Sequence, residues 1–291
     1  MKSLILASCI GVALVGTVST VRAETIFGLS TASSIFSFDS ATPGTVSPVI
    51  PITGIVTGSI VDIDFSPVAQ SLYGIASNGD LYRINTTTGV ATLSIGVGAQ
   101  LPANTITAPT VMDFNPAADR IRVFQGTSNF RLTGDAATFD SAQTAGTISI
   151  DGTFAGVAGA NLVAAAYTNN FNGTGATTLY SLDTTADTLI IHSVAPQFST
   201  IATVGPLGVN IGTGVGFDIS ALQAAISGYV SDGDNFYTVN LGTGALTSVG
   251  TINNGAVTTK SIAAATVPEP SAALLGAAGL LGLLTRRRRN G

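Results

Sequence analysis

The sequence is poor in the residues from which most catalytic and metal sites are built. Its 291 residues include one cysteine, one histidine and no tryptophan, and only two glutamates, Glu24 and Glu269. A single histidine excludes a metal site with several histidine ligands, and a Ser-His-Asp triad would have to use His192. That residue ends an apolar run, and no G-x-S-x-G motif is present. We therefore expect a structural or surface histidine, and a protein that is not an enzyme.

The one cysteine, Cys9, lies in a leader-like segment. Residues 1–23 contain Lys2, a following apolar run and the small or apolar residues of Val21–Ala23, which is the pattern of a cleaved secretory signal peptide. A lipoprotein signal at Leu6–Cys9 is the alternative. After ordinary cleavage the mature chain would have no cysteine, so neither a disulfide nor a thiolate metal site would stabilise it.

Charged residues are scarce and mostly acidic. Only 9 % of the chain is charged, and between residues 24 and 266 five basic residues stand against fifteen acidic ones, a net charge of about −10. Nucleic-acid-binding proteins need a basic face, so we exclude nucleic acid as a partner. A hydrophobic fraction of 45 % argues against disorder.

Short strand-like runs between turn residues are what the sequence has in abundance. Residues 61–96 contain four of them, each rich in β-branched and aromatic residues: Val61–Phe65, Leu72–Ile75, Leu81–Ile84 and Ala91–Ile95. Asn78-Gly79, between the second and third runs, suits a tight hairpin because both residues tolerate positive φ. Four consecutive antiparallel strands of this length are typical of one blade of a β-propeller.

The third run is an aromatic-x-apolar-x segment that recurs along the chain. Its copies begin at Phe36, Tyr82, Phe130, Tyr180 and Tyr237. The steps of 46, 48, 50 and 57 residues predict an all-β propeller of five four-stranded blades over residues 24–266, with six blades as the alternative. The first blade lacks its own first strand, and the run Thr259–Ala265 would supply it and close the ring. The fourth blade, Leu162–Val194, is the least regular, and helical patterning is confined to Ser220–Ile226.

The composition changes abruptly over residues 267–291. Val267, Pro268, Glu269 and Pro270 precede fifteen uncharged residues, Ser271–Thr285, which are followed by Arg286, Arg287, Arg288 and Arg289. Fifteen residues are short for a membrane span of about 20 residues, and the arginines would hold the end of the chain on the cytoplasmic side. A plain C-terminal membrane anchor is one interpretation of this tail.

The three parts of the tail, in this order, resemble the PEP-CTERM sorting signal of Gram-negative bacteria that make exopolysaccharide. The resemblance implies processing by exosortase, a membrane enzyme, and export to the cell surface or matrix. The body resembles a bacterial secreted family classed only as a domain of unknown function (number 4394), which implies a propeller-like all-β domain and no known activity. The segments that carry this second resemblance are Asp64–Pro67, Leu72–Ile75, Leu81–Asn85, Asp113–Pro116, Arg120–Val123, Ala165–Asn169 and Val204–Val209.

Four aspartates fall on the predicted first strands, which line the central channel of a propeller: Asp62, Asp64, Asp113 and Asp218. Several like charges meeting there could raise one pKa, and glycosidases need one protonated and one ionised carboxyl. An aspartate ahead of Phe-x-Pro can instead accept hydrogen bonds from the amides of the turn that follows, and we favour this structural role. Asp232–Asn235 offers oxygen ligands for calcium without the glutamate of an EF-hand loop, and a hairpin turn explains it equally. We expect no metal and no cofactor.

Arg120, Arg122 and Arg131 form the one local basic cluster. They could bind an anionic polymer, or pair with Asp113, Asp119 or Asp135, and we favour the pairing. Our leading hypothesis is an exported, non-catalytic protein of the cell surface or extracellular matrix, anchored transiently or lastingly in the inner membrane by its tail. It would be a scaffold for exopolysaccharide or matrix proteins, which it would bind through loops at one end of the ring. The alternative is an Asp-dependent polysaccharide hydrolase or lyase.

Overall fold

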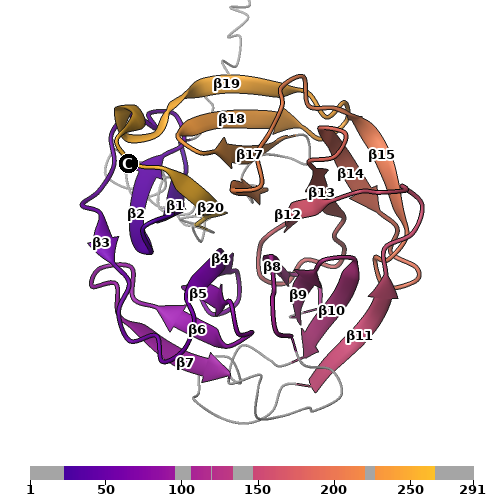
Figure 1. Cartoon of the computed structure of the whole chain (residues 1–291), viewed down its shortest axis with the longest axis horizontal. Helices are drawn as coiled ribbons and strands as arrows, with labels where there is room; N and C mark the ends of the chain where they lie inside the picture. Colours follow the sequence, from indigo (N-terminus) through magenta and orange to yellow (C-terminus); the bar gives the residue numbers. More distant parts are fainter. Residues whose placement is uncertain (1–22, 96–105, 119, 134–146, 220–226, 266–291) are drawn as a thin grey trace, which may run out of the picture.

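The computed structural model describes residues 23–95, 106–118, 120–133, 147–219 and 227–265, which form a five-bladed β-propeller (Figure 1). Blade A contains β20 (Thr259–Ala264), β1 (Thr25–Ser30), β2 (Ser34–Asp39) and β3 (Ile50–Pro51). Blade B contains β4 (Ile60–Ser66), β5 (Ser71–Ala76), β6 (Leu81–Ile84) and β7 (Ala91–Ile95). Blade C contains β8 (Val111–Asn115), β9 (Arg120–Gln125), β10 (Ser128–Thr133) and β11 (Thr147–Thr153).

The remaining two blades follow the same order from the channel outward. Blade D contains β12 (Leu162–Tyr167), β13 (Leu179–Asp183), β14 (Thr188–His192) and β15 (Ile201–Pro206). Blade E contains β16 (Val215–Asp218), β17 (Ser227–Asp232), β18 (Asn235–Asn240) and β19 (Leu246–Thr251), and a 3₁₀ turn (Ile252–Gly255) follows it. The described residues contain no helix that is long and apolar enough to cross a membrane.

The C-terminal strand closes the ring, as predicted. Strand β20 pairs antiparallel with β1, with Ile26 opposite Ala264 and Gly28 opposite Ile262. The prediction of five blades is therefore confirmed, and the alternative of six is wrong. Because β1 and β20 run in opposite directions, the start of β1 and the end of β20 lie at the same end of the ring, where the Ala265 amide donates to the Thr25 carbonyl (2.8 Å).

The aromatic repeat marks the third strand in four blades, and in blade D the prediction was wrong. Tyr180 lies in the second strand of that blade, β13, and the third strand is β14. The fourth strand, β15, extends the blade beyond Val194, where we expected it to end. Alternating aromatic and apolar residues suit any strand that is buried between two blades, so the pattern cannot distinguish a second strand from a third. The predicted helical segment, Ser220–Ile226, lies outside the described residues.

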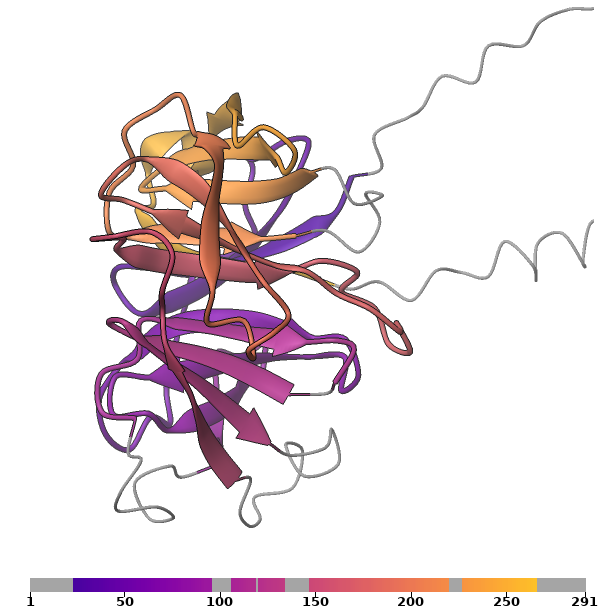
Figure 2. The ribbon, with the colours of Figure 1, turned by 90° about the vertical axis from the view of Figure 1, so that its right-hand side faces the viewer.

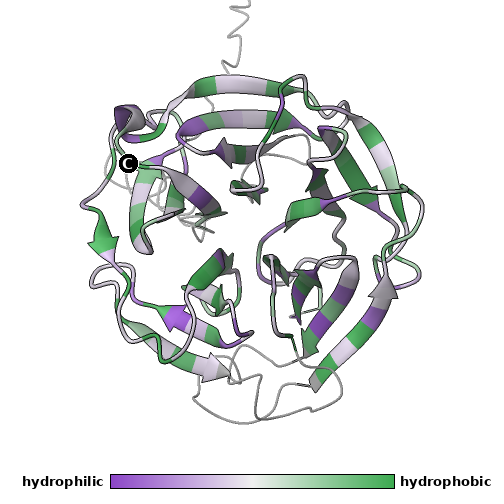
Figure 3. Cartoon of the chain, viewed as in Figure 1, coloured by the Kyte–Doolittle hydropathy of each residue, from purple (hydrophilic) through white to green (hydrophobic). Residues whose placement is uncertain are grey.

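Hydrophobic side chains fill the space between each blade and the next, giving five clusters for five interfaces. Between blades B and C, Tyr73 of β5 meets Phe114 of β8 with ring centroids 5.3 Å apart. Between blades D and E, Ala166 of β12 and Phe217 of β16 belong to one buried cluster. In Figure 3 the innermost strand β4 is largely hydrophobic, and β9 and β10 alternate between hydrophobic and hydrophilic residues. Burial on both faces of every blade explains the low content of charge.

Tight turns join the strands within the blades. At the β5–β6 hairpin Gly79 has φ +89°, and a Cβ there would lie 2.2 Å from the Ile106 carbonyl oxygen, so glycine is required. Asn78 is not among the residues with positive φ, unlike our expectation. The Asp232–Asn235 segment is a two-residue hairpin turn between β17 and β18, with Gly233 at φ +62°.

Candidate functional site at the central channel

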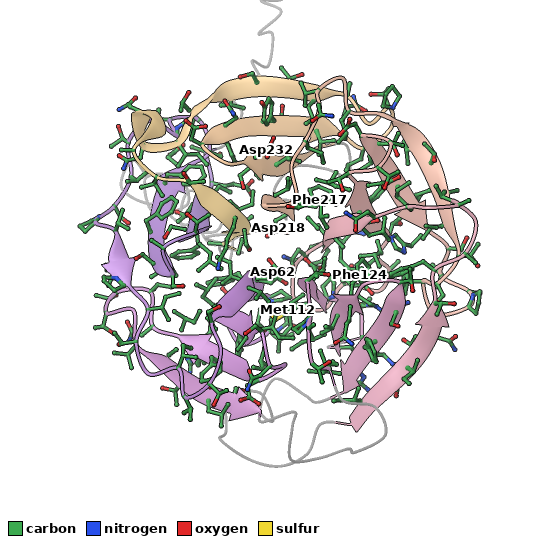
Figure 4. All side chains as sticks on the ribbon, in the orientation of Figure 1. Asp62, Met112, Phe124, Phe217, Asp218 and Asp232 are labelled. Atoms are coloured by element: carbon green, nitrogen blue, oxygen red, sulfur yellow. The ribbon has the colours of Figure 1, made fainter. Side chains whose placement is uncertain are left out.

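The five innermost strands surround the channel without pairing with one another. Figure 2 shows the ring from the side, with the blades stacked around this axis. Each innermost strand therefore points some backbone amides at the next blade, and buried amides need acceptors. Three aspartates supply them, and Figure 4 shows one of these, Asp218, near the centre of the ring together with Asp62.

The carboxylates of Asp64, Asp113 and Asp218 accept five backbone amides, one from each blade. Asp64 accepts from Phe65 of its own blade (2.6 Å) and from Phe114 of blade C (2.6 Å). Asp113 accepts from Tyr167 of blade D (2.9 Å). Asp218 accepts from Ile219 of its own blade (2.6 Å) and from Ala264 of blade A (2.6 Å). The ring of carboxylates thus connects three blades to their neighbours.

The amide that donates to the carboxylates comes, in each blade, directly after the same position of the innermost strand. Blades B, C and E have an aspartate there, whereas blades D and A have Ala166 and Ala263. An alanine side chain cannot accept a hydrogen bond, so blades D and A offer no acceptor to the next blade. The Ile219 and Phe65 amides of those next blades donate instead to Asp218 and Asp64 of their own blades. Three carboxylates are sufficient for five amides because two of them use both oxygen atoms.

Asp62 lies one step nearer the start of β4 and makes a separate set of contacts. Its Oδ2 accepts from the Met112 amide of blade C (2.6 Å), and its Oδ1 accepts from the Ser261 hydroxyl of blade A (2.5 Å) and from the Ile63 amide (3.0 Å). Ser261 Oγ also accepts the Ile63 amide (3.1 Å). Asp62 and Ser261 therefore connect blade B to both of its neighbours.

Burial dominates the electrostatics of the channel. Desolvation raises the pKa of Asp62 and of Asp218 to about 7. It also holds the pKa of Asp64 and of Asp113 well above the usual value, with the charge of Asp218 adding to the effect at Asp64 and that of Asp64 at Asp113. The ligand oxygens of Asp64, Asp113 and Asp218 lie within 4.8 Å of one another, so these carboxyls compete for ionisation.

Oxygen atoms at this spacing are also the ligands that a hard cation prefers. The bonds to the amides account for the carboxylates without a cation, because amide hydrogens supply positive partial charge on several sides of the cluster. We expected these aspartates to accept amides of the turn that follows, and this was wrong. Asp64 and Asp218 accept the amide of the adjacent residue instead, and after β4 the Ala69 amide of the turn donates to Ser66 Oγ. The second contact, to the next blade, was not predicted from the sequence.

A cavity of about 370 Å³ opens the channel at the end where the innermost strands begin. All five blades line it, and its charged residues are Asp62 and Lys260. Lys260 Nζ donates to the Ile60 carbonyl (2.8 Å). We name this cavity the channel mouth. Sequence reasoning found the strand Thr259–Ala265 but missed Lys260 and Ser261 as channel residues, although their places at the start of an innermost strand carried that signal.

His192 is buried between blades C and D (2 % exposed). Its Nδ1 lies 2.8 Å from the Phe198 carbonyl oxygen and its Nε2 lies 2.8 Å from Ser181 Oγ. Since a carbonyl only accepts, Nδ1 carries the hydrogen and Nε2 accepts from the serine. Desolvation lowers the pKa of His192 to about 4, so the ring is neutral near pH 7. Ser181 is fully buried, and this pair fixes the position of the Phe198 loop.

Arg122 does not face solvent, and of the proposed partners that the structure describes, Asp113 is not paired with it. It is 3 % exposed, and its ion pair is with Asp151 of β11 (2.7 Å), while Nε donates to the Tyr167 hydroxyl (3.0 Å). Arg131 approaches the same carboxylate (3.3 Å). Register places Asp113 opposite Arg122 in the backbone, but the Asp113 carboxylate accepts the Tyr167 amide instead. Asp119 and Asp135 lie outside the described residues, as do the leader and the tail with Val267–Pro270 and Arg286–Arg289.

A family model described as "Domain of unknown function (DUF4394)" matches residues 34–263. The chain belongs to this family. The match covers the five-bladed ring from β2 to most of β20, so this member of the family is a β-propeller. No curated protein matches the sequence.

Several solved structures are similar to this chain at low sequence identity. A chain of the nidogen/laminin complex is 11 % identical with a TM-score of 0.50, and the alignment covers 84 % of this chain and 99 % of that one. YCF48 bound to D1 peptide gives 13 % identity, a TM-score of 0.36, and coverage of 82 % and 73 %. PorZ of Porphyromonas gingivalis gives 14 %, 0.38, and coverage of 76 % and 27 %. The first of these similarities supports the propeller fold and nothing more specific.

Proposed function

We propose that this protein is an exported, non-catalytic scaffold of the cell surface or extracellular matrix that associates with exopolysaccharide. The proposed location is supported by the leader and by the PEP-CTERM-like tail of the sequence. An exosortase-type enzyme would process this tail at the membrane. A closed ring with few free edges is a rigid frame for loops that bind a partner.

The observation that carries the non-catalytic part is the state of the candidate catalytic groups. Asp64, Asp113, Asp218 and His192 are each at most 3 % exposed, and each is bonded to backbone or to a buried hydroxyl. A general acid or base must reach a substrate within hydrogen-bond distance. Buried groups that already serve the backbone support a structural role.

One observation favours the alternative of an Asp-dependent hydrolase or lyase. The cluster holds several carboxyls whose pKa values are raised, and a glycosidase needs a protonated carboxyl beside an ionised one. Chemistry at Asp64, Asp113 or Asp218 would require the ring to open, because these carboxyls are at most 3 % exposed, whereas Asp62 lines the channel mouth. The alternative therefore predicts that a polymer is shortened and that Asp64→Asn abolishes this while the fold remains.

The test is calorimetric titration of the mature protein with the host's own exopolysaccharide, with and without calcium, followed by measurement of polymer length. Binding with the polymer intact is the expected result. Shortening of the polymer would replace the scaffold by the enzyme. If the titration gives no heat and the polymer keeps its length, the association with exopolysaccharide is contradicted. Matrix proteins would then be the partners to test.

A further inference from the structure

The channel mouth combines a polar rim, apolar walls and one cation in a single cavity. Rim positions Thr110, Asn161 and Thr213 are exposed, and the walls include Val61, Pro109, Leu162, Val163 and Val215. The cavity of about 370 Å³ lies within the range of small-molecule sites, roughly 300–1,000 Å³. Hydroxyl and amide groups above apolar walls are suited to a sugar unit, whose ring has polar edges and apolar C–H faces.

The position of the mouth in the ring leaves it accessible on an anchored protein. The mouth lies where the innermost strands begin, beside Lys260 near the start of β20. The two ends of the ring, at Thr25 and Ala265, are bonded to each other at the opposite end of the channel. A tail that continues from β20 would therefore hold the protein by the far end, and the mouth would face away from the attachment.

Charge at the mouth is unequally available to a ligand. Both oxygens of Asp62 are occupied, since they accept from Met112, Ile63 and Ser261. Lys260 Nζ has three hydrogens and donates one to the Ile60 carbonyl. Lys260 also lines the cavity, so its ammonium group is within reach of a ligand there. Burial lowers the pKa of Lys260, and a bound anion would favour its charged form.

We propose that the channel mouth binds a carboxylate-bearing sugar unit, with Lys260 as the partner of the carboxylate and the rim of Thr110, Asn161 and Thr213 as partners of the hydroxyls. This inference rests on the proposed association with exopolysaccharide and names the chemical class of its ligand. The charge of Lys260 favours an acidic sugar over a neutral one, and the apolar walls contact the C–H face of the sugar ring.

Tri-galacturonate is the probe, and maltotriose is the neutral control of similar size. Both are titrated calorimetrically into the mature wild-type protein at low and at physiological salt. Three variants are compared with it: Lys260→Met removes the charge and keeps the length of the side chain, Thr213→Trp fills the mouth, and Arg83→Met removes a cation that lies outside the mouth in blade B. Thermal melting checks that each variant folds.

We expect wild type to bind tri-galacturonate at least tenfold more tightly than maltotriose, and more weakly as salt rises. Lys260→Met and Thr213→Trp should each lose tenfold or more, and Arg83→Met should bind as wild type does. Should Lys260→Met fail to fold, Thr213→Trp alone carries the test, because Thr213 is exposed. Equal binding of the two sugars, no binding of tri-galacturonate, or binding unaffected by the mouth variants would each overturn the proposal.

The host polymer separates this inference from the proposed function. If the wild type binds intact exopolysaccharide and both mouth variants bind it equally well, the scaffold function holds and the mouth is not its site. If the wild type binds no exopolysaccharide but binds tri-galacturonate through Lys260, the site holds and the association with exopolysaccharide is wrong. A further titration replaces the trimer with monomeric galacturonate. Its binding distinguishes a site for a free acidic sugar from a site for the acidic end of a chain.

Discussion

The interface between blades B and C and the interface between blades D and E are held together in different ways. At B–C, Asp62 and Asp64 of β4 accept the Met112 and Phe114 amides of β8 beside a hydrophobic cluster. At D–E the side chains of β12 that face β16 are apolar, with Ala166 where β4 has Asp64, and Phe217 of β16 packs in the same hydrophobic cluster.

The difference shows that one ring can be closed by two kinds of force with different responses to conditions. Packing of apolar surface is insensitive to pH, whereas the carboxylates at B–C are coupled to two others in the channel. Hydrogen bonds in the channel specify the stagger between blades, because an amide must meet a particular oxygen. Apolar contacts at D–E tolerate small shifts more readily.

The largest effect is expected at the apolar interface. Phe217→Ala should lower the free energy of unfolding by about 3–5 kcal/mol, because a buried phenyl ring is lost and a cavity remains. The loss should be the same at pH 5 and pH 8, as measured by chemical denaturation. Leu93→Ala, at an exposed position of β7, is the control and should change stability by about 0.5 kcal/mol or less. A pH-dependent loss at Phe217 would contradict the division between the two interfaces.

The next comparison concerns two carboxylates of the channel. Asp64 accepts amides with both oxygens, and a carboxamide can accept with only one, so Asp64→Asn should cost about 1–3 kcal/mol, the penalty of one unpaired buried amide. Asp113 needs one oxygen for Tyr167, so Asp113→Asn keeps that bond and relieves repulsion from Asp64. We expect it to be neutral or stabilising at pH 8. Equal destabilisation by the two variants in denaturation experiments would show that the count of amides is not what matters.

The pH dependence of stability has a defined sign above pH 6.5. Asp62 and Asp218 have pKa values of about 7 in the folded protein and about 3.9 when unfolded. The folded protein therefore retains protons that the unfolded chain has lost, and stability falls as pH rises, by up to about 1.4 kcal/mol per pH unit for each retained proton. The part of this fall that Asp62 and Asp218 cause ends once both have ionised, above about pH 8, and the raised pKa values of Asp64 and Asp113 act in the same direction.

His192 acts in the opposite direction at lower pH. Its pKa is about 4 in the folded protein and about 6.5 when unfolded, so its contribution to stability is lost as pH falls through that range. Denaturation midpoints between pH 6.5 and 8.5 isolate the carboxyls, and Asp218→Asn should flatten the profile there. Stability that rises with pH over this interval would refute the assignment of protons to the channel.

A modest loss of stability is expected where a hydroxyl connects blades A and B. Ser261→Ala removes the donor to Asp62 and one acceptor of the Ile63 amide, which retains Asp62 as a partner. We expect a loss of about 1 kcal/mol, the usual contribution of one hydrogen bond. Ser261→Thr restores the hydroxyl and should recover most of the stability if the channel accommodates the methyl group. Recovery by threonine distinguishes the bond from packing.

The sequence was sufficient to predict the ring but not the contacts inside it. Runs such as Leu72–Ile75 and Ala91–Ile95 carry local period-two signals, and the repeat and the spare C-terminal strand together predicted a closed ring of five blades, with six as the alternative. In blade D the same local signal misled, because Tyr180 satisfies it in a second strand. Long-range stagger between blades decides which amide meets which carboxylate, and the partners are 46 to 54 residues apart.

In the candidate site, too, the positions of the residues were predictable and their contacts were not. Asp62, Asp64, Asp113 and Asp218 were predicted to lie on the first strands, and the structure brings all four to the channel, because side-chain alternation fixes which face a residue occupies. Their burial was not predictable, since it depends on how closely five strands approach the axis. The same is true of Arg122, whose partner Asp151 comes from two strands further along its own blade.

Pairing between β1 and β20 makes the order of synthesis relevant to this fold. The ribosome produces β1 first and β20 last among the strands, so a growing chain holds four blades that can mature and one that cannot. Until Thr259–Ala264 has emerged, the inner edge of β1 has no partner, and the Asp218 carboxylate has no Ala264 amide to bind. The ring therefore closes only after β20 has been made. Truncation anywhere before this strand leaves the inner edge of β1 unpaired, whereas a chain that includes β20 covers that edge.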